Sequence, residues 1–550
     1  MPAYRDPFGF RLRPNMVNIA PGFWEGPIVF RTLLFLTLFF SLACGPAAAA
    51  ADDVREIGVA PSSPGMPART VILPAWSEAA IEQLAITLFD APSHGLPALD
   101  QTAEDLLDRS RPSEQRAALA SRAFLRFGGW LRYGLTDSQT HILNVLDDAE
   151  HAELHNALAA ALADGRVAQA LDQLAPDLGE YRALRAEMLR LLALQPIWPR
   201  IEPGPSLALG ERGPRVDQLR ARLAAVDVYR EDWSLGEAFD LRLETAVRRY
   251  QGRANLSPSG RMDQATLSQL NITPQDRMAQ LRVNLEQRRW QSRDPGRRHI
   301  RVNLADFTLE AWQDGQLARR HRVMVGRQIS STPEFSEDMQ YIVLNPWWGI
   351  PGGLARTRFQ SFRRNPGLAA QRGFRIYDAS GTQISVYDID WSRWGRSWPY
   401  RMSQPPGSSN PMGEVKFIFP NSHNVYIHDT TERDRFSETR RDFSAACIRV
   451  MDPLVLAEWV LSSQEGWSGE EIERVAAGST PTVIWLDDRL PVHINYWTVV
   501  SDADGNIRYL NDLYRRDGTL IRQFELAHAQ ASEPEGGRIA SRGAAQVSLN

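Results

Sequence analysis

The sequence has few cysteines, a single lysine and no large excess of charge of either sign. Its 550 residues include two cysteines, which excludes both a framework of disulfide bonds and a zinc site built from thiolates alone. Lys416 is the only lysine, so nearly all of the positive charge is arginine. The 62 basic and 66 acidic residues give a net charge of −4, which argues against a protein that binds nucleic acid.

The apolar runs are short as well. The run LLFLTLFFSLA, at 33–43, falls below the roughly 20 residues that cross a membrane. It follows Arg31 and precedes a series of alanines, which is the layout of a secretory signal. Residues 1–50 are therefore predicted to be a signal peptide, with Met16 as an alternative start, or an uncleaved anchor in the inner membrane. Either interpretation predicts a protein of the periplasm.

The two cysteines have different expected fates. Cleavage among the alanines removes Cys44 and leaves Cys447 as the one thiol of the mature protein. A lipoprotein signal at Cys44 is a weaker interpretation, because leucine stands one position too close to the cysteine. An unpaired thiol in an oxidising compartment calls for a chemical role.

Composition and periodicity divide the rest of the chain into several folded parts. Hydrophobic residues make up 43% and charged residues 23%, as in globular proteins. Apolar spacings of three and four predict helices up to about residue 200, and strict alternation from residue 299 predicts strands. The expected fold class is a multidomain α+β protein. The expected parts are a linker at 51–75, a helical scaffold at 76–204, a three-helix unit at 205–271, a scaffold helix at 272–298, a mostly β domain at 299–490 with an insertion at 351–406, a C-terminal β-hairpin at 491–527 and a disordered tail at 528–550.

His151 and His155 lie four residues apart on a predicted helix, a spacing that can seat a metal ion. No glutamate follows the first histidine, as a zinc protease requires. We therefore expect a solvated helix face here and no metal site.

The three-helix unit places apolar residues on one face of each helix, and Asp263 is the expected N-cap of the third. Its phrases G-E-R-G-x-x-V-x-x-L-R-x-R-L and A-V-x-x-Y-Q resemble the small peptidoglycan-binding domain attached to many cell-wall enzymes. Asn255 stands where that family usually has glycine, and asparagine tolerates the left-handed conformation that the turn needs. A generic three-helix spacer is the alternative interpretation.

The residues that carry chemistry meet in one segment, 424–450. His428 ends a predicted strand, and Cys447 follows 19 residues later, after a loop that contains four arginines. A thiol is a nucleophile only as the thiolate, which a neighbouring imidazole and nearby positive charge favour. The order of histidine then cysteine excludes the papain arrangement. On spacing alone, an inert buried cysteine and a packed histidine are the more common outcome.

This segment resembles the active site of the L,D-transpeptidases, in which a histidine is followed, after a spacer of this length, by Ser/Thr-His-Gly-Cys, a hydrophobe and arginine. The matching positions are His428, Ser444, Cys447, Ile448 and Arg449. The stretches MVGRQISSTPEFS, YIVLNPWWGIP and NPMGEVKFIFPNSHNVYIHDT also resemble the large bacterial subgroup of this family. That subgroup joins a helical scaffold and a peptidoglycan-binding domain to the catalytic domain and carries a capping insertion.

The resemblance implies an enzyme of cell wall biogenesis that needs no metal and no cofactor. It would join diaminopimelate residues of two tetrapeptide stems of peptidoglycan through a thioester on Cys447, and carbapenem-type inhibitors would acylate the same thiol. His428 would be the base, held by the backbone carbonyl of Asp429. Supporting roles in the cysteine loop or the substrate groove are expected for Arg449, Ser444, Tyr426 and Trp347.

Two residues depart from the family pattern, because Ala445 and Ala446 replace His-Gly before the nucleophile. Ala445 removes an imidazole that is not the expected base. Ala446 replaces a glycine whose access to positive φ lets backbone N–H groups point at the developing oxyanion. Three functions therefore remain open: a transpeptidase, a hydrolase in which water replaces the acceptor amine, and a wall-binding protein with a disabled catalytic domain.

Overall fold

The computed structural model describes residues 55–57, 71–73, 75–194, 198–226, 229, 237–350, 360–391, 400–502 and 505–532. The predicted signal or anchor at 1–50 and most of the predicted tail lie outside these ranges. No helix within them is long and apolar enough to cross a membrane. Residues 349–403 form one unit and the rest of the described chain forms another. The predicted fold class, multidomain α+β, is confirmed.

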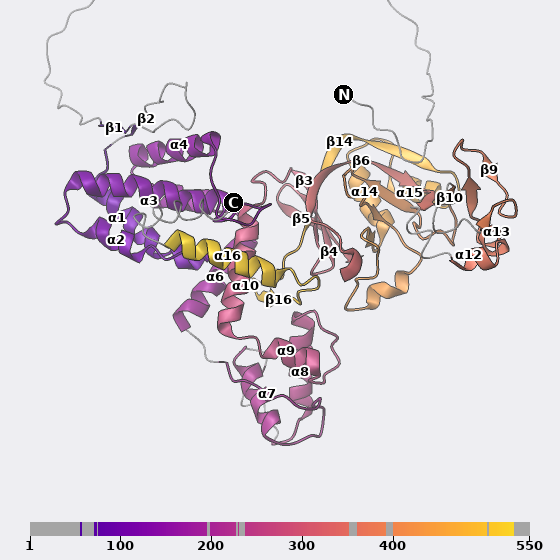
Figure 1. Ribbon diagram of the computed structural model, residues 1–550, viewed down its shortest axis with the longest axis horizontal. Coiled ribbons are helices and arrows are strands. Elements are labelled where there is room, and N and C mark those ends of the chain that lie inside the picture. The colour runs from indigo at the N-terminus through magenta and orange to yellow at the C-terminus, as the bar shows by residue number, and fades with distance from the viewer. Residues whose placement is uncertain are drawn as a thin grey trace, which may run out of the picture. The chain divides into compact units, whose positions relative to one another are not determined.

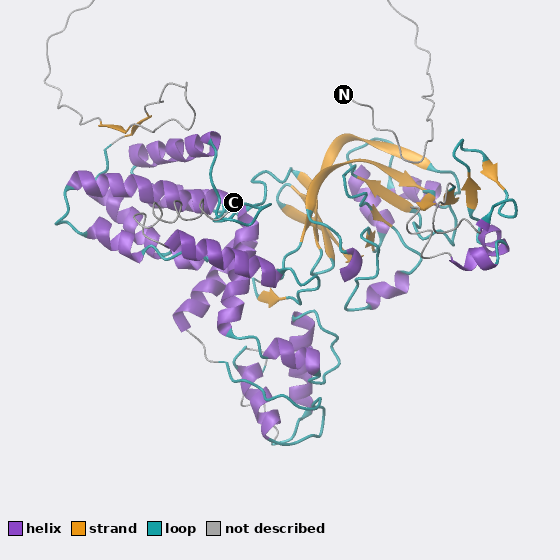
Figure 2. Ribbon diagram, in the orientation of Figure 1, coloured by secondary structure: helices purple, strands orange, loops and turns teal. Residues whose placement is uncertain are grey.

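Helices dominate the described chain up to residue 194, as the apolar periodicity predicts (Figure 2). Ser77 begins the first of them by accepting the N–H of Ala80. Their apolar faces share one core with parts of α10 (Pro274–Arg289) and α16 (Asp517–Ser532). A short antiparallel pair, β1 (Arg55–Ile57) and β2 (Val71–Leu73), precedes them. The helices are α1 (Glu78–Phe89), η1 (Ala91–His94), α2 (Asp100–Leu107), α3 (Ser113–Tyr133), α4 (Asp148–Asp164), α5 (Val167–Leu174) and α6 (Gly179–Leu194).

His151 of α4 is exposed and His155 is half-buried, and both rings bond to their own helix. Nδ1 of His151 lies 2.8 Å from the carbonyl oxygen of Asp147, and Nδ1 of His155 lies 2.7 Å from that of His151. Asp147 and Glu150 form a reciprocal capping box at the start of the same helix. In each ring, Nδ1 is therefore engaged by a backbone carbonyl oxygen of the same segment.

The three-helix unit consists of α7 (Pro214–Ala224), α8 (Leu241–Arg253) and α9 (Gln264–Leu270), packed around their own apolar core. Asp263 caps α9 as predicted, because its carboxylate accepts the N–H of Thr266 at 2.8 Å. Asn255 takes the left-handed conformation expected of it, with φ of 57°. Its amide also donates to the carbonyl oxygen of Ala305 at 3.1 Å.

Eight strands close into a barrel in the order β11-β12-β13-β5-β4-β3-β14-β6. Apolar residues of the barrel strands form the second large apolar core of the described chain, together with residues of segments 454–476 and 496–514. The predicted hairpin at Asp314-Gly315 joins β4 to β5. The strands are β3 (Arg298–Asn303), β4 (Thr308–Gln313), β5 (Gln316–Met324), β6 (Phe335–Leu344), β11 (Val415–Ile418), β12 (Ile427–His428), β13 (Ile448–Val450) and β14 (Thr482–Asn495). Short helices η3 (Gln328–Ser330), η5 (Arg433–Ser437), α14 (Pro453–Leu461) and α15 (Gly469–Ala476) lie between them in the chain.

The insertion between β6 and β11 has its own small sheet, in the order β7-β10-β8-β9. It also has its own apolar packing, with the rings of Phe362 and Phe374 5.2 Å apart. Its elements are β7 (Trp348–Ile350), α12 (Gln360–Arg364), α13 (Gly367–Gln371), β8 (Arg375–Tyr377), β9 (Gln383–Ile384) and β10 (Arg401–Gln404).

The C-terminal segment differs from the predicted hairpin at 491–527. β14 extends through Asn495, and the hairpin is confined to β15 (Val499–Ser501) and β16 (Ile507–Tyr509). The chain then forms α16, which also takes in residues 528–532 of the predicted tail. The helix was missed because its stability comes from distant partners, since buried residues of α16 join the core of the N-terminal helices.

Helix α10 is joined to β15 by a buried polar network. The side-chain oxygen of Asn284 accepts the N–H groups of Thr498 and Val499, each at 3.0 Å. Its amide donates to Thr498 Oγ1 at 3.0 Å and to the carbonyl oxygen of Gln280 at 2.9 Å. Arg288 adds a bond of 2.8 Å to the carbonyl oxygen of Val499. One fully buried amide thus satisfies two backbone donors of the hairpin.

We expect Asn284→Ala to lower the free energy of unfolding by about 2 to 4 kcal/mol, because it leaves two buried N–H groups without acceptors. Urea denaturation measures the effect. The exposed Gln275→Ala on the same helix is the control and should change stability by less than about 0.5 kcal/mol. Equal stability of both variants would contradict the assigned role of Asn284.

Candidate active site

The pairing of β12 with β13 positions the candidate site residues. The two strands run parallel, with Ile427 opposite Ile448 and His428 opposite Arg449. Both isoleucines are fully buried in the barrel core. Since side chains alternate along a strand, Cys447, His428 and their neighbours at alternate positions face the other side. The predicted cysteine and histidine, 19 residues apart in sequence, therefore share one face.

Cys447 directly precedes β13 and is half-buried. Its Sγ lies 3.9 Å from the carbonyl oxygen of Asn424. Burial raises the pKa of the Cys447 thiol above its usual range, while Tyr426, Lys416 and Arg449 act in the opposite direction. The resting group is consequently a thiol at neutral pH.

His428 is buried, with 2% of its surface exposed. Burial, assisted by the charges of Arg449 and Lys416, lowers the pKa of His428 to about 3, although the backbone of Asp429 acts in the opposite direction. The imidazole is therefore neutral at neutral pH and can accept a proton. Its ring centre lies 5.5 Å from that of Tyr426.

Lys416 is a site residue to which the sequence analysis assigned no role. It pairs with His428 across β11 and β12, and its Nζ lies 3.7 Å from the centre of the Tyr426 ring. Such a contact is a cation–π interaction. The ammonium group of Lys416 therefore lies beside Tyr426, which neighbours both the thiol of Cys447 and the imidazole of His428. The one sequence feature that could have drawn attention to Lys416 is that it is the only lysine of the chain.

Ala446 has a φ of +85°, the region that glycine prefers. Its carbonyl oxygen accepts a 2.7 Å hydrogen bond from Thr332 Oγ1. The same hydroxyl accepts the N–H of Gly326 at 2.9 Å. A side chain on Gly326 would approach the oxygen of Ser330 to 2.2 Å, so glycine is required at that close contact. Ala446 thus adopts the positive φ that glycine has at this position in the family pattern.

Ser444 anchors the cysteine loop through its backbone. Its N–H donates to the carbonyl oxygen of Val325 at 2.9 Å, and its own oxygen accepts from the N–H of Arg327 at 3.0 Å. These bonds form an isolated parallel bridge between Gly326 and Ser444, just beyond the end of β5. The segment that carries the thiol is therefore fixed on the barrel.

Asp429 is fully buried and organises the loop behind His428. Its carboxylate accepts the N–H of Glu414 at 2.9 Å and forms an ion pair of 2.8 Å with Arg433. Gly413 passes so close that an added side chain would come within 2.0 Å of that carboxylate, at a φ of +61°. Its side chain supports the fold of this loop, while Nδ1 of His428 has no hydrogen-bond partner within the described residues, so the predicted bond to the Asp429 carbonyl stays a prediction.

Arg449 and Trp347 are the two remaining residues that the sequence analysis assigns to the site. Arg449, 7% exposed, forms an ion pair with Glu432, next to η5. This pair ties the loop before the cysteine to β13, and the role of Arg449 in the site stays a prediction. Trp347 lies half-buried between β6 and β7, at the start of the insertion. Its part in the substrate groove stays a prediction.

Three stretches of the chain match known protein families. Residues 297–493 match the family described as "L,D-transpeptidase catalytic domain", residues 72–188 match "Scaffold domain", and residues 212–270 match "Putative peptidoglycan binding domain". The first of these contains the whole face around Cys447 and His428.

Similar proteins carry corresponding names. The chain is 31% identical over 229 residues to a "Putative L,D-transpeptidase" of Haemophilus influenzae, and the similar region covers 42% of this chain and 45% of that relative. The chain thus spans about half the length of the curated relative that it matches. Solved structures include an L,D-transpeptidase of Mycobacterium smegmatis, with 11% identity over 36% of this chain and 58% of the other at a TM-score of 0.18. Another is an L,D-transpeptidase of Stackebrandtia nassauensis, with 12% identity over 54% and 97% at a TM-score of 0.19.

The family matches agree with the resemblance seen in the sequence and with its order of parts along the chain. The chain therefore carries an L,D-transpeptidase catalytic domain, preceded by a scaffold domain and by a domain of the peptidoglycan-binding family.

Proposed function

We propose that the protein is a peptidoglycan L,D-transpeptidase that links diaminopimelate residues of two stem peptides. The observation that carries this proposal is the strand register that brings Cys447 and His428 to one face of a domain of this family. The substrate is expected to be a tetrapeptide stem. The domain of the peptidoglycan-binding family would bring the enzyme to the cell wall.

The proposed reaction has two halves with balanced proton transfers. In the first, Cys447 Sγ attacks the carbonyl carbon of diaminopimelate while neutral His428 takes the thiol proton. The C–S bond forms, the C–N bond breaks, and His428 returns the proton to the departing D-alanine. In the second, the side-chain amine of another stem attacks the thioester. A new C–N bond forms, the C–S bond breaks, and the amine proton returns through His428 to the sulfur.

The surroundings of the thiol suit this role. Lys416 and Tyr426 favour the thiolate that develops during attack, since both oppose the rise of the thiol pKa caused by burial. We assign Arg449 and Asp429 to positioning the loops on either side, because each forms an ion pair across them. Ser444 and Ala446 would orient the backbone N–H groups of the cysteine loop towards the oxyanion. Trp347 would line the substrate groove.

Of the three alternatives, only the disabled domain depends on the conformation of Ala446. A disabled domain would be favoured if alanine kept the loop from positive φ, and the φ of +85° argues against that interpretation. A hydrolase would use the same acyl-enzyme with water as acceptor.

Reaction on the wall requires a location outside the cytoplasm, and we propose export to the periplasm by the segment at 1–50.

Mass spectrometry after exposure to a carbapenem tests the proposal. We expect one adduct on the wild type, none on Cys447→Ala, and acylation slowed by about a hundredfold or more in His428→Ala. The exposed His423→Ala is the matched control and should react as the wild type does. An adduct on Cys447→Ala would overturn the assignment of the nucleophile. Products formed from disaccharide-tetrapeptides then separate transpeptidation from hydrolysis.

The pH dependence of thiol alkylation tests the resting state of the pair. Because the pKa of Cys447 is raised and that of His428 is about 3, both groups are neutral at neutral pH. The thiolate fraction should grow about tenfold per pH unit between about pH 6 and pH 8, and so should the rate with iodoacetamide. A plateau from about pH 5 upwards would instead indicate a preformed thiolate–imidazolium pair.

Replacement of Ala446 by glycine tests whether the alanine strains the loop. Relief of positive φ is worth roughly 1 to 2 kcal/mol, and the greater freedom of the unfolded chain offsets about 0.4 to 1 kcal/mol of it. We expect Ala446→Gly to raise the free energy of unfolding by up to about 1.6 kcal/mol and to acylate at a similar rate. Ala445→Gly, at a neighbour without positive φ, is the control and should destabilise. A rise in acylation of about a hundredfold would mean that the natural alanine misaligns the oxyanion donors.

A further inference from the structure

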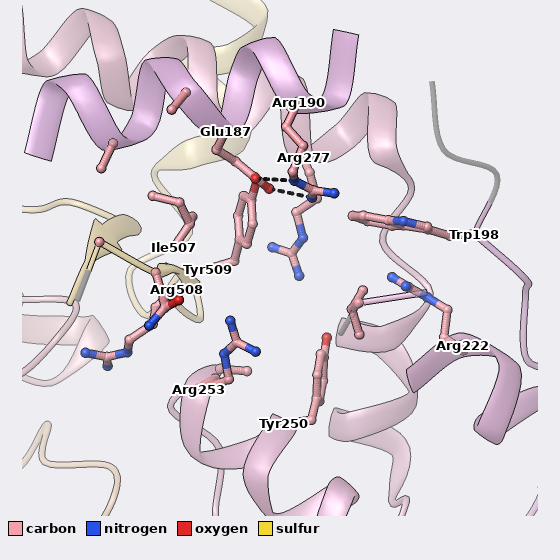
Figure 3. Close-up of a pocket in the computed structure, with 16 residues that line it drawn as sticks. Glu187, Arg190, Trp198, Arg222, Tyr250, Arg253, Arg277, Ile507, Arg508 and Tyr509 are labelled. Carbon is pink, nitrogen blue, oxygen red and sulfur yellow. Dashed lines mark hydrogen bonds and ion pairs between the residues drawn. The ribbon is translucent and has the colours of Figure 1, made fainter. Parts of the chain in front are cut away.

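A cavity of about 370 Å³ lies away from Cys447, among α6, α7, α8, α10 and β16 (Figure 3). Its lining is strongly positive. The charged residues that line it are Arg190, Arg222, Arg253, Arg277, Arg508 and Glu187. Nothing in the proposed reaction uses these groups.

Two of the five arginines have carboxylate partners. Arg190 pairs with Glu187 at 2.7 Å, and Arg508 pairs with Asp306 at 2.7 Å. The other three, at positions 222, 253 and 277, form no ion pair within the described residues. Three arginines of the cavity therefore lack a directly paired carboxylate, although the buried Asp517 acts on Arg277 at longer range, since Gln280 bonds to both side chains.

The deepest of these charges belongs to Arg222, which is 1% exposed. Its Nε donates to the carbonyl oxygen of Leu270 at 2.5 Å, and its guanidinium lies 4.2 Å from the centre of the Trp198 ring. Its Nη1 is buried and has no hydrogen-bond partner within the described residues. Burial lowers the pKa of Arg222 only to about 10, so it remains a cation at neutral pH. A buried donor of this kind, left unsatisfied, is costly.

Arg277 and Arg253 complete the cluster. Arg277, 4% exposed, lies 4.5 Å from the centre of the Tyr509 ring and bonds only neutral oxygens, including that of Gln280 at 2.8 Å. Arg253 is half-buried at the end of α8. In Figure 3 the side chains of Arg253, Arg277 and Arg222 surround the same space.

Aromatic side chains form the remaining walls. Trp198, Tyr250 and Tyr509 line the space between the arginines (Figure 3). Such faces can pack against the carbon atoms of a ligand whose charged groups meet the guanidinium groups. The site thus combines convergent cations with apolar walls.

We propose that this cavity binds a small ligand with at least two anionic oxygen groups, and that free carboxylates of a peptidoglycan stem peptide are the favoured source. Planar guanidinium groups bind carboxylates and phosphates in bidentate fashion. The volume is in the range of pockets for small ligands. Arg222, Tyr250 and Arg253 belong to the domain that matches the peptidoglycan-binding family, which favours the stem peptide over a phosphate ester.

Binding here differs from the proposed reaction, because the ligand would be held and not transformed. Its partners come from the scaffold helix α6, from the three-helix unit and from the hairpin strand β16. An occupied cavity would therefore stabilise the packing of these parts on one another.

Isothermal titration calorimetry on the full chain tests the proposal with three probes: the free stem tripeptide, the same tripeptide with its carboxylates amidated, and inorganic pyrophosphate. We expect the free tripeptide to bind, amidation to weaken it by about tenfold or more, and Arg253→Gln to weaken it similarly. Arg249→Gln is the matched control, because it removes the same charge from an exposed position of α8 outside the cavity and should bind as the wild type does. Arg253 is the first choice for substitution, since it is half-buried and makes no described ion pair.

The other outcomes are equally decisive. Pyrophosphate binding that depends on Arg253, without tripeptide binding, would keep the anion site and assign its source to phosphate. Absence of binding by both probes, or equal tripeptide binding by Arg253→Gln and wild type, would overturn the site. Carbapenem acylation of Cys447 is measured separately, so failure of this inference is distinguishable from failure of the proposed reaction.

Discussion

The parallel pairing of β12 with β13 is the contact on which the candidate site depends. It comprises two residue pairs and would not be stable alone. β11 on one side and β5 on the other hold it inside a closed barrel. A shift of one residue in either strand would turn its isoleucine out of the core and its reactive neighbour inwards. The apolar side chains of Ile427 and Ile448 therefore determine that thiol and imidazole share a face.

A second constraint is the buried polar surface of α10. Besides the bonds of Asn284 to the hairpin, the helix carries a buried ion pair of 2.5 Å between Arg289 and Glu286. Glu286 also accepts the N–H and hydroxyl of Thr136, at 2.6 and 2.8 Å. Breaking such a pair on one side leaves a buried charge, which is strongly destabilising. Arg277 of the cavity lies on this same helix, so the cavity and the hairpin contact have a common support (Figure 1).

Much of this architecture follows from local sequence signals. Apolar periodicity is sufficient to predict the N-terminal helices, and capping chemistry is sufficient at Asp263, because both act over a few residues. The left-handed turn at Asn255 is predictable for the same reason. The segment from histidine to cysteine could be recognised only through its resemblance to a family motif, because spacing alone favours an inert cysteine and a packed histidine.

Other features depend on contacts between distant parts of the chain. The positive φ of Ala446 is imposed by a loop that Thr332, 114 residues away, holds in place. α16 is stabilised by a core formed mainly by the first hundred residues of the folded chain. The arginine-lined cavity joins residues from position 183 to position 509, and no local pattern announces it. Lys416 shows the same limit, since only the strand register reveals its neighbours.

The single lysine has a practical meaning for anyone who handles the protein. Reagents directed at primary amines find one side chain in the entire sequence, and that ammonium group lies against the ring of Tyr426. Dyes, biotin or activated beads coupled through amines will consequently attach either at the chain terminus or directly beside the thiol. Immobilisation through Lys416 obstructs the candidate site, whereas the abundant carboxylates offer attachment points elsewhere.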